Sequence, residues 1–324
     1  MMIKEKYIIG IDGGGTKTEA ILFNEEGKTL SRVDGPGTNL YVYKEDAAKS
    51  ILTLIEDLTK NIGINISDIS ALGCSLAGIS DLNSRDLLLK YFDKLNITSN
   101  TLVLSDTESA YNLLCPSGQG LLVSIGTGIV CLGRDVEGIS FKIAGKGYDK
   151  GDVGSGYWIG KETIKKIVLN QTALTVDDDM IEIYDIVKNQ LGINDIDSLE
   201  SKLIDEGDMV FKTAILAKDI ITSAQNGNDI SLSIIQEGTR NVAEYILFLI
   251  DDLKISKNKV IIAGNGSIIK NEFYRKSLND SLQFDINDIH WVFSNISCAY
   301  SAGIMAAKYK NINVSINDIV KNIN

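Results

Sequence analysis

The stretch IGIDGGGTKT, residues 9–18, places three consecutive glycines directly after a short apolar strand. Glycine weakens regular structure, so such a run indicates a backbone that turns sharply or approaches a ligand closely. A Walker A loop, GxxxxGK followed by Ser or Thr, needs Lys directly after its second glycine, whereas here Thr16 stands between Gly15 and Lys17. A dinucleotide-binding glycine motif opens a helix, whereas the following TEAILF is strand-like. The remaining interpretation is a β-hairpin whose tip offers backbone amides, hydroxyls and the carboxylate of Asp12.

The same order of elements is expected twice along the chain. The first half predicts strands at 7–12, 18–24, about 29–33, 70–76 and 101–105, with helices at 45–60, 83–94 and 107–114. The second half predicts strands at 120–125, 128–134, 139–144, 258–263 and 289–293, with helices at 155–169, from 271 and at 298–309. A helical stretch at about 179–251 is interpreted as an insertion. Both halves follow βββαβαβα, which favours an internal duplication over two unrelated domains.

This pattern predicts an α/β protein of two domains, residues 1–117 and 118–324, each with a mixed sheet flanked by helices. In the second half, Gly126-Thr127-Gly128 occupies the place that matches the first glycine loop. Two such hairpins facing each other across a cleft would hold a triphosphate from both sides, as phosphoryl transfer requires. A third segment, Gly264-Asn265-Gly266, joins a buried strand to a helix. It could approach an adenosine, although a simple left-handed turn explains it nearly as well.

The composition excludes several classes of protein. Lys and Arg number 32 against 43 Asp and Glu, which gives a net charge of −11 and argues against nucleic-acid binding. The sequence contains neither an apolar run long enough to span a membrane nor the apolar stretch of a signal peptide at its start. The four cysteines are widely spaced and form no CxxC motif, as is typical of a reducing compartment. We therefore expect a cytoplasmic protein without nucleic-acid or membrane partners.

Together with these loops, the segment GDVGSGYWIG at 151–160 resembles the N-acetylglucosamine kinases. These belong with the BadF-type ATPases to the superfamily of actin, sugar kinases and heat-shock chaperone ATPases. The similarity covers almost the whole chain, with the motifs in order. It implies two duplicated actin-like (ribonuclease H-like) domains and ATP-dependent, Mg²⁺-dependent phosphorylation of an amino sugar. N-acetylglucosamine is the leading acceptor and N-acetylmuramic acid the second, with O6 as the expected hydroxyl.

The resemblance also implies roles for individual residues. ATP contacts would come from Asp12, Gly13, Gly14, Gly15, Thr16, Lys17, Gly126, Thr127, Gly128, Gly264, Asn265 and Gly266, with Asp12 near the metal. Sugar contacts would come from Thr38, Asn39, Asp106, Gly145, Lys146, Gly147 and Asp152. Asp106 matches the catalytic base, and its place after a strand suits a group that takes a proton from the attacking hydroxyl. From the residues alone, helix capping explains Asp106 and Asp152 about as well.

Two residues depart from the family pattern. Lys146 stands where the family usually has Trp, and Val153 where it has Glu. Lys146 could meet the lactyl carboxylate of N-acetylmuramic acid, although a solvated surface lysine is the simpler interpretation. The exact sugar therefore stays open at this point.

Three other functions compete with this interpretation. One is a glucosamine kinase. Another is an ATPase activator of 2-hydroxyacyl-CoA dehydratases, whose bridging iron–sulfur cluster needs paired cysteines in loops unlike those around Cys115 and Cys131. A third is a sugar-sensing regulator, which usually has a DNA-binding segment that an acidic chain does not favour. We also expect a homodimer, because apolar residues between 207 and 251 could form a dimer face, although core packing explains them equally well.

Overall fold

A computed structural model describes residues 5–145, 147, 152–193, 195, 199 and 208–323. The chain forms two compact units, one built from Met1–Leu113 and Ser294–Asn324 and the other from Leu114–Phe293. The expected boundary after residue 117 lies close to the start of the second unit. The expectation that residues 118–324 form one domain is wrong for Ser294–Asn324, because this segment packs on the sheet of the first unit.

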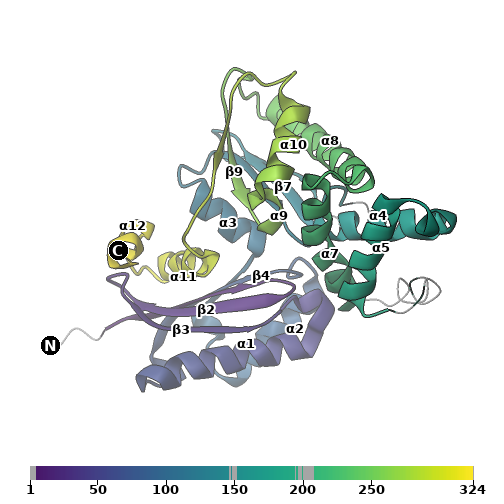
Figure 1. The fold of residues 1–324 in the computed structure, drawn as a ribbon. Coiled ribbons are helices and arrows are strands. Elements are labelled where there is room, and N and C mark those ends of the chain that lie inside the picture. The colour runs from purple at the N-terminus through teal and green to yellow at the C-terminus, as the bar shows by residue number, and fades with distance from the viewer. Residues whose placement is uncertain are drawn as a thin grey trace. The chain divides into compact units, whose positions relative to one another are not determined.

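The first unit contains a five-stranded sheet in the order β3-β2-β1-β4-β5. Strands β1, β2 and β3 form an antiparallel meander, and β4 and β5 run parallel to β1. Helices α1 and α2 cover one face, whereas α11 covers the other (Figure 1). The bounds are β1 (Tyr7–Gly13), β2 (Lys17–Asn24), β3 (Thr29–Pro36), β4 (Ile69–Leu76), β5 (Thr101–Ser105), α1 (Leu40–Ile62), α2 (Leu82–Lys94), α3 (Asp106–Leu114) and α11 (Cys298–Tyr309).

The backbone of helix α11 packs in close contact with the backbone of the sheet. Gly10 of β1 and Gly73 of β4 are partners across the parallel ladder. A Cβ atom on Gly10 would lie 1.8 Å from the carbonyl oxygen of Ala299, and one on Gly73 would lie 1.9 Å from that of Ala302. Both positions therefore need glycine for close packing, because any larger residue would displace the helix.

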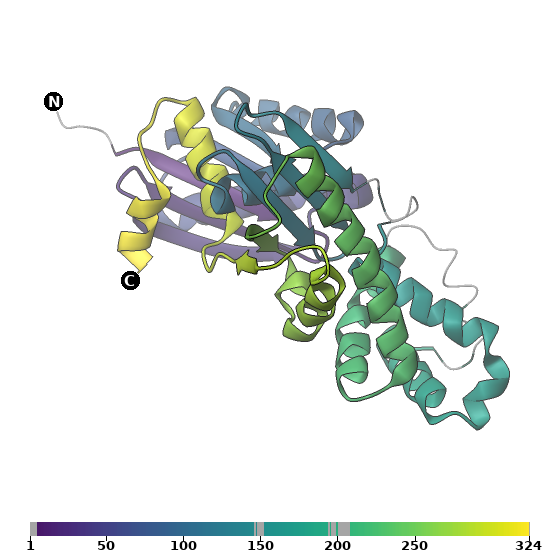
Figure 2. The ribbon, with the colours of Figure 1, turned by 90° about the horizontal axis from the view of Figure 1, so that it is seen from above.

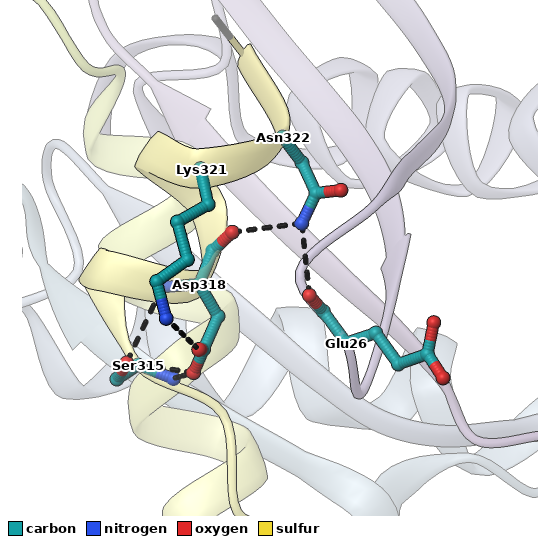
Figure 3. Close-up of polar contacts among 5 residues, drawn as sticks. All are labelled: Glu26, Ser315, Asp318, Lys321 and Asn322. Atoms are coloured by element: carbon teal, nitrogen blue, oxygen red, sulfur yellow. Dashed lines mark hydrogen bonds and ion pairs between the residues drawn. The ribbon is translucent and has the colours of Figure 1, made fainter.

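A last helix, α12 (Ile316–Ile323), follows α11 and was not expected from the sequence. Figure 3 shows how it is held: the backbone N–H and hydroxyl of Ser315 donate to the Asp318 carboxylate at 2.9 and 2.7 Å. The Asn322 amide donates to the carbonyl of Glu26, in the β2–β3 turn, at 2.9 Å. The side chain of Ile319 is fully buried. These contacts fasten α12 to the turn between β2 and β3.

The second unit repeats the arrangement of the first. Its sheet has the order β10-β9-β6-β7-β8, in which β6 to β10 correspond in sequence and direction to β1 to β5. The bounds are β6 (Gly120–Ile125), β7 (Ile129–Arg134), β8 (Ser140–Ala144), β9 (Val260–Asn265), β10 (Ile289–Val292), α4 (Gly156–Leu169), α5 (Asp178–Leu191), α7 (Asp208–Gln225), α8 (Asp229–Asp252), α9 (Ser267–Lys270) and α10 (Glu272–Leu282). The predicted duplicated α/β fold is therefore confirmed.

Helices α4, α5, α7 and α8 pack against one another, as the teal and green helices of Figure 2 show. Of these, α5, α7 and α8 occupy the predicted helical insertion. Short 3₁₀ turns lie at Ile66–Asp68, Thr98–Asn100 and Gln171–Thr175. Throughout the part of the chain that the structure describes, every helix is too short or too polar to span a bilayer.

Candidate functional site

In the first unit, three parallel strands end at one edge of the sheet and bring two carboxylates close together. Asp12 lies near the end of β1 opposite Ser75 of β4, and Asp106 directly follows β5. The Ser75 hydroxyl, fully buried, donates to Asp12 Oδ1 at 3.1 Å. Burial and the nearby charge of Asp106 raise the pKa of Asp12 from 3.8 to about 7, although the Ser75 hydrogen bond opposes this rise.

Asp106 is the first residue of α3, and its side chain is exposed. Its Oδ1 accepts a hydrogen bond from the N–H of Thr107 at 2.8 Å, which orients the carboxylate. The cap of the helix is Ser105, whose hydroxyl accepts from the N–H of Glu108 at 3.1 Å. Because Ser105 carries out the capping, the cap does not explain why an aspartate stands at position 106.

The β1–β2 hairpin carries the first glycine loop. The N–H of Gly14 donates to the carbonyl of Lys17 at 3.0 Å and closes the turn. A Cβ on Gly13 would lie 2.1 Å from Thr38 Oγ1, so Gly13 is needed for packing against the next loop. A Cβ on Gly14 would meet only an ordinary contact at 3.6 Å, and Thr16 is exposed. Packing therefore does not explain the glycine at 14, where the absence of a side chain leaves room for a ligand to approach the hairpin.

The predicted sugar loop 37–39 packs on this hairpin. Thr38 is fully buried, and its hydroxyl bonds to that of Thr18 at 2.8 Å. Its side chain therefore holds the loop together, and we do not retain the predicted sugar contact for it. The half-buried Asn39 caps α1, because its Oδ1 accepts from the N–H groups of Tyr41 and Val42 at 3.1 and 3.3 Å. Helix α1 thus begins at Leu40, five residues earlier than expected.

The end of β4 connects these parts. The N–H of Ala77 donates to the carbonyl of Gly13 at 2.8 Å, and its own carbonyl accepts from the N–H of Leu40 at 3.1 Å. Gly78 follows with a φ of +79°, and a Cβ there would lie 2.4 Å from Asn39 Oδ1. Sequence reasoning missed these residues and Ser75. The signal that could have indicated them is the run CSLAG, residues 74–78, which brings small residues to the end of an apolar strand.

In the second unit, the Gly126-Thr127-Gly128 turn is tied to the start of α4. The N–H of Gly126 donates to the carbonyl of Gly128 at 3.0 Å. The N–H groups of Gly156 and Tyr157 donate to the carbonyls of Gly126 and Thr127 at 2.8 and 3.0 Å. The loop and the helix therefore form one hydrogen-bonded structure.

Asp152 lies beside this loop. Its side chain is buried, and a Cβ on Gly128 would lie 3.2 Å from its Oδ2. The N–H of Gly145 donates to its Oδ1 at 3.1 Å, so two predicted sugar-site residues are in contact. Capping does not explain Asp152, because Ser155 caps α4 through the N–H of Trp158 at 3.2 Å. Gly147, two positions after Gly145, has a φ of +102°. Lys146, between these two glycines, lies outside the described residues.

The third glycine segment packs directly on the second. A Cβ on Gly266 would lie 2.3 Å from the carbonyl oxygen of Ile125, and Gly266 has a φ of +94°. The Asn265 amide donates to the Ser124 hydroxyl at 3.2 Å. A Cβ on Gly264 would lie 2.3 Å from the ring of Phe293. Close approach of the backbone therefore explains Gly264 and Gly266.

The predicted site residues thus form two groups, one in each unit. Asp12, Gly13, Gly14, Gly15, Thr16, Lys17, Thr38, Asn39 and Asp106 belong to the first, and Gly126, Thr127, Gly128, Gly145, Gly147, Asp152, Gly264, Asn265 and Gly266 to the second.

The pair of carboxylates suits a hard divalent cation. The charge of Asp106 raises the cost of ionising Asp12, which a cation would offset, and carboxylate and hydroxyl oxygens are ligands that Mg²⁺ prefers. Within the described ranges, no group of three or more His, Cys, Asp or Glu side chains could hold a metal. Mg²⁺ bound to nucleotide does not need such a group, because one or two carboxylates and the phosphates suffice.

Two kinases of known function are similar in sequence to this chain. An N-acetylmuramic acid/N-acetylglucosamine kinase from Clostridium acetobutylicum is 27% identical over 286 residues, which cover 85% of this chain and 90% of that protein. An N-acetyl-D-glucosamine kinase from Dictyostelium discoideum is 28% identical over 205 residues, 55% of this chain and 64% of that protein.

A solved structure shares the fold. The crystal structure of a candidate N-acetylglucosamine kinase from Chromobacterium violaceum has a TM-score of 0.70 and 18% identity, and the match covers 94% of this chain and 100% of that one. The model of the BadF/BadG/BcrA/BcrD ATPase family matches residues 9–307, nearly the whole sequence. The chain therefore belongs to the BadF/BadG/BcrA/BcrD ATPase family.

Proposed function

We propose that this chain is an ATP-dependent kinase of amino sugars, with N-acetylglucosamine as the leading acceptor. The observation that carries the proposal is the pair Asp12 and Asp106, which lies beside a glycine hairpin at the carboxyl ends of parallel strands. Phosphoryl transfer to a hydroxyl needs a group that helps to hold the phosphates and a second carboxylate that takes a proton. The kinases from Clostridium and Dictyostelium support the choice of an amino sugar.

The glycine loops would bind the nucleotide. The backbone amide of Gly15 and the exposed hydroxyl of Thr16 are donors suited to phosphate oxygens, as are the amides of Thr127 and Gly128, whereas the N–H groups of Gly14 and Gly126 close their own turns. Gly264–Gly266 would lie along the adenosine. Asp12 would hold Mg²⁺, directly or through water, and the bound cation would offset the negative charge of the phosphates.

Asp106 would act as the general base. Its side chain is exposed at the end of β5, and the Thr107 N–H holds it in one orientation. It would accept the proton of the acceptor hydroxyl, which we propose is O6, as that oxygen attacks the γ-phosphoryl group in line.

The acceptor would be recognised by Asn39, Asp152 and the backbone of Gly145 and Gly147. The carboxylate of Asp152 accepts from the Gly145 N–H through Oδ1, and as an acceptor it is suited to a sugar hydroxyl. Lys146 would favour an acceptor with a carboxylate, which N-acetylmuramic acid has and N-acetylglucosamine lacks. Both sugars therefore belong in the first test.

We also propose that the enzyme works as a cytoplasmic homodimer. Among the described residues, Ile215 of α7 and Phe248 of α8 are about half exposed, at 48% and 53%, which suits a face between two copies. Light scattering coupled to gel filtration should give twice the chain mass, and Phe248→Ser should lower it to that of one chain.

The test of the function is ADP release from Mg·ATP with N-acetylglucosamine, N-acetylmuramic acid, glucosamine, N-acetylmannosamine, glucose or no sugar. Asp106→Asn, purified in parallel, controls for contaminating ATPases. Sugar-dependent release by the wild type is expected, with an N-acetylhexosamine as the best acceptor. Equal release without sugar would contradict the proposal and favour a dehydratase-activating ATPase. A preference for glucosamine would change the proposed acceptor and leave the proposed kinase activity standing.

A further inference from the structure

Tyr274 of α10 reaches the turn that carries Asp152. Its side chain is completely buried, and its hydroxyl donates a 2.7 Å hydrogen bond to the carbonyl oxygen of Gly154. Burial raises the pKa of this hydroxyl above its ordinary value, so the group stays protonated and acts as a donor. The hydrogen bond joins residues that are 120 positions apart in the sequence.

The turn at Gly154 is tightly packed and depends on glycine. Gly154 has a φ of +89°, and a Cβ there would lie 2.6 Å from Val242 Cγ2 and 2.8 Å from the carbonyl oxygen of Gly238. Only glycine fits this position, and glycine is the residue with the greatest backbone freedom. Across the turn, the N–H of Ser155 donates to the carbonyl of Asp152 at 3.1 Å, and the Tyr274 hydroxyl adds a contact from α10.

Both ends of the turn lead to the candidate site. Asp152, at its start, accepts from Gly145 N–H and lies beside Gly128. Ser155, at its end, caps α4. The Gly126–Gly128 loop is also held by the β6–β7 ladder and by contact with Gly266, and neither of these contacts passes through the Gly154 turn. A change in the turn should therefore affect Asp152 more than the loop.

We infer that Tyr274 is a positioning residue for the acceptor side of the site: its hydroxyl fixes the Gly154 turn and thereby the direction of Asp152. The inference rests on the proposed function for the identity of the acceptor. The ring of Tyr274 fills the core and its hydroxyl bonds the turn, so Tyr274→Phe separates the two roles. The matched control is Tyr300→Phe in the first unit, which also removes a hydroxyl from a buried tyrosine, one bonded to Thr29 at 2.6 Å.

The first measurement is initial-rate kinetics with Mg·ATP and N-acetylglucosamine. If the turn is correctly formed in only about a tenth of Tyr274→Phe molecules, KM for the sugar rises about 10-fold. KM for ATP should change less than about 2-fold on the same argument. Tyr300→Phe should leave both constants unchanged. An equal rise in both KM values, or a sugar KM like that of the wild type, would overturn the inference.

The second measurement does not depend on activity. Amide hydrogen exchange followed by mass spectrometry reports the N–H groups of Ser155 and Trp158, which donate to the Asp152 carbonyl and to the Ser155 hydroxyl. Exchange of this segment should quicken about 10-fold in Tyr274→Phe and stay unchanged in Tyr300→Phe. Unchanged exchange in Tyr274→Phe would overturn the inference alone. Absence of sugar-dependent ADP release in the wild type would instead overturn the proposed function and the acceptor role with it.

Discussion

Replacing Asp12 by Asn should make the protein more stable in the absence of metal and nucleotide. The folded carboxyl has a pKa of about 7, above its ordinary value of 3.8, so the folded state binds this proton more tightly than the unfolded state. The contribution of Asp12 to the free energy of unfolding is therefore largest below pH 4, and it is lost as the pH rises to 7. Asparagine keeps an oxygen that can accept from Ser75 and carries no charge.

The size of the effect follows from the two pKa values. Each unit of pKa corresponds to about 1.36 kcal/mol, so the full difference would destabilise the charged form by about 4 kcal/mol at pH 8. The side chain is only partly buried, so water screens part of this, and we expect a gain of about 2 kcal/mol for Asp12→Asn. At pH 5 the wild-type carboxyl is protonated when folded, and the gain should shrink to less than half.

Thermal unfolding at pH 5 and pH 8, in EDTA, measures this directly. A gain of about 2 kcal/mol corresponds to a rise in Tm of roughly 3 °C for a protein of this size. The control is Asp57→Asn, a change of the same chemistry at an exposed position of α1. Adding Mg·ATP should reverse the order, because the wild type gains a ligand that Asp12→Asn binds poorly.

The reasoning would be refuted if Asp12→Asn were less stable than the wild type at pH 8 without ligand. It would equally be refuted if the stability difference were the same at pH 5 and pH 8. Either result would mean that the carboxylate of Asp12 is well solvated or has a cationic partner. The two-carboxylate site would then lose its physical basis.

Three further substitutions test other parts of the structure. Asp106→Asn should lower kcat on the order of 10²- to 10⁴-fold, with Tm and nucleotide binding by calorimetry unchanged; an active, well-folded variant would remove the assignment of the base. Asp152→Asn should raise KM for the sugar at least about 10-fold in initial-rate assays, because a hydrogen bond to a charged group is lost, and a selective rise in KM for ATP would speak against its role. Gly73→Ala should lower the free energy of unfolding in urea by about 2 kcal/mol or more, since its methyl group would collide with the backbone at Ala302; an unchanged midpoint would show that α11 moves freely.

Most of the fold could be predicted because local patterns specify it. The hairpin around Gly13–Gly15 follows from glycines between apolar strands, and the equivalent turn at Gly126–Gly128 follows from the repeat. The start of α1 at Leu40 was missed because Lys44, at a φ of +46°, interrupts the helical pattern.

Contacts between distant residues could not be predicted in the same way. Ser75 and Tyr274 reach their partners across 63 and 120 residues, and neither forms part of a motif. The packing of Ser294–Asn324 on the first sheet was missed for a related reason: the repeat assigns this segment to the second half, whereas its small residues fit Gly10 and Gly73. The parts that Thr38 and Asn39 take in loop packing and helix capping could not be predicted either, because they depend on side-chain geometry.

The contact between α11 and the first sheet has a consequence for synthesis on the ribosome. Cys298, at the start of α11, lies 189 residues beyond Ser109, to which its carbonyl is bonded. At a synthesis rate of about 5 to 20 residues per second, roughly 10 to 40 s pass between synthesis of the five strands and synthesis of the helix that covers one of their faces. Ile8, Ile21 and Phe23 remain unshielded during this time. A nascent chain of this protein should therefore depend on a chaperone more strongly than its final stability suggests.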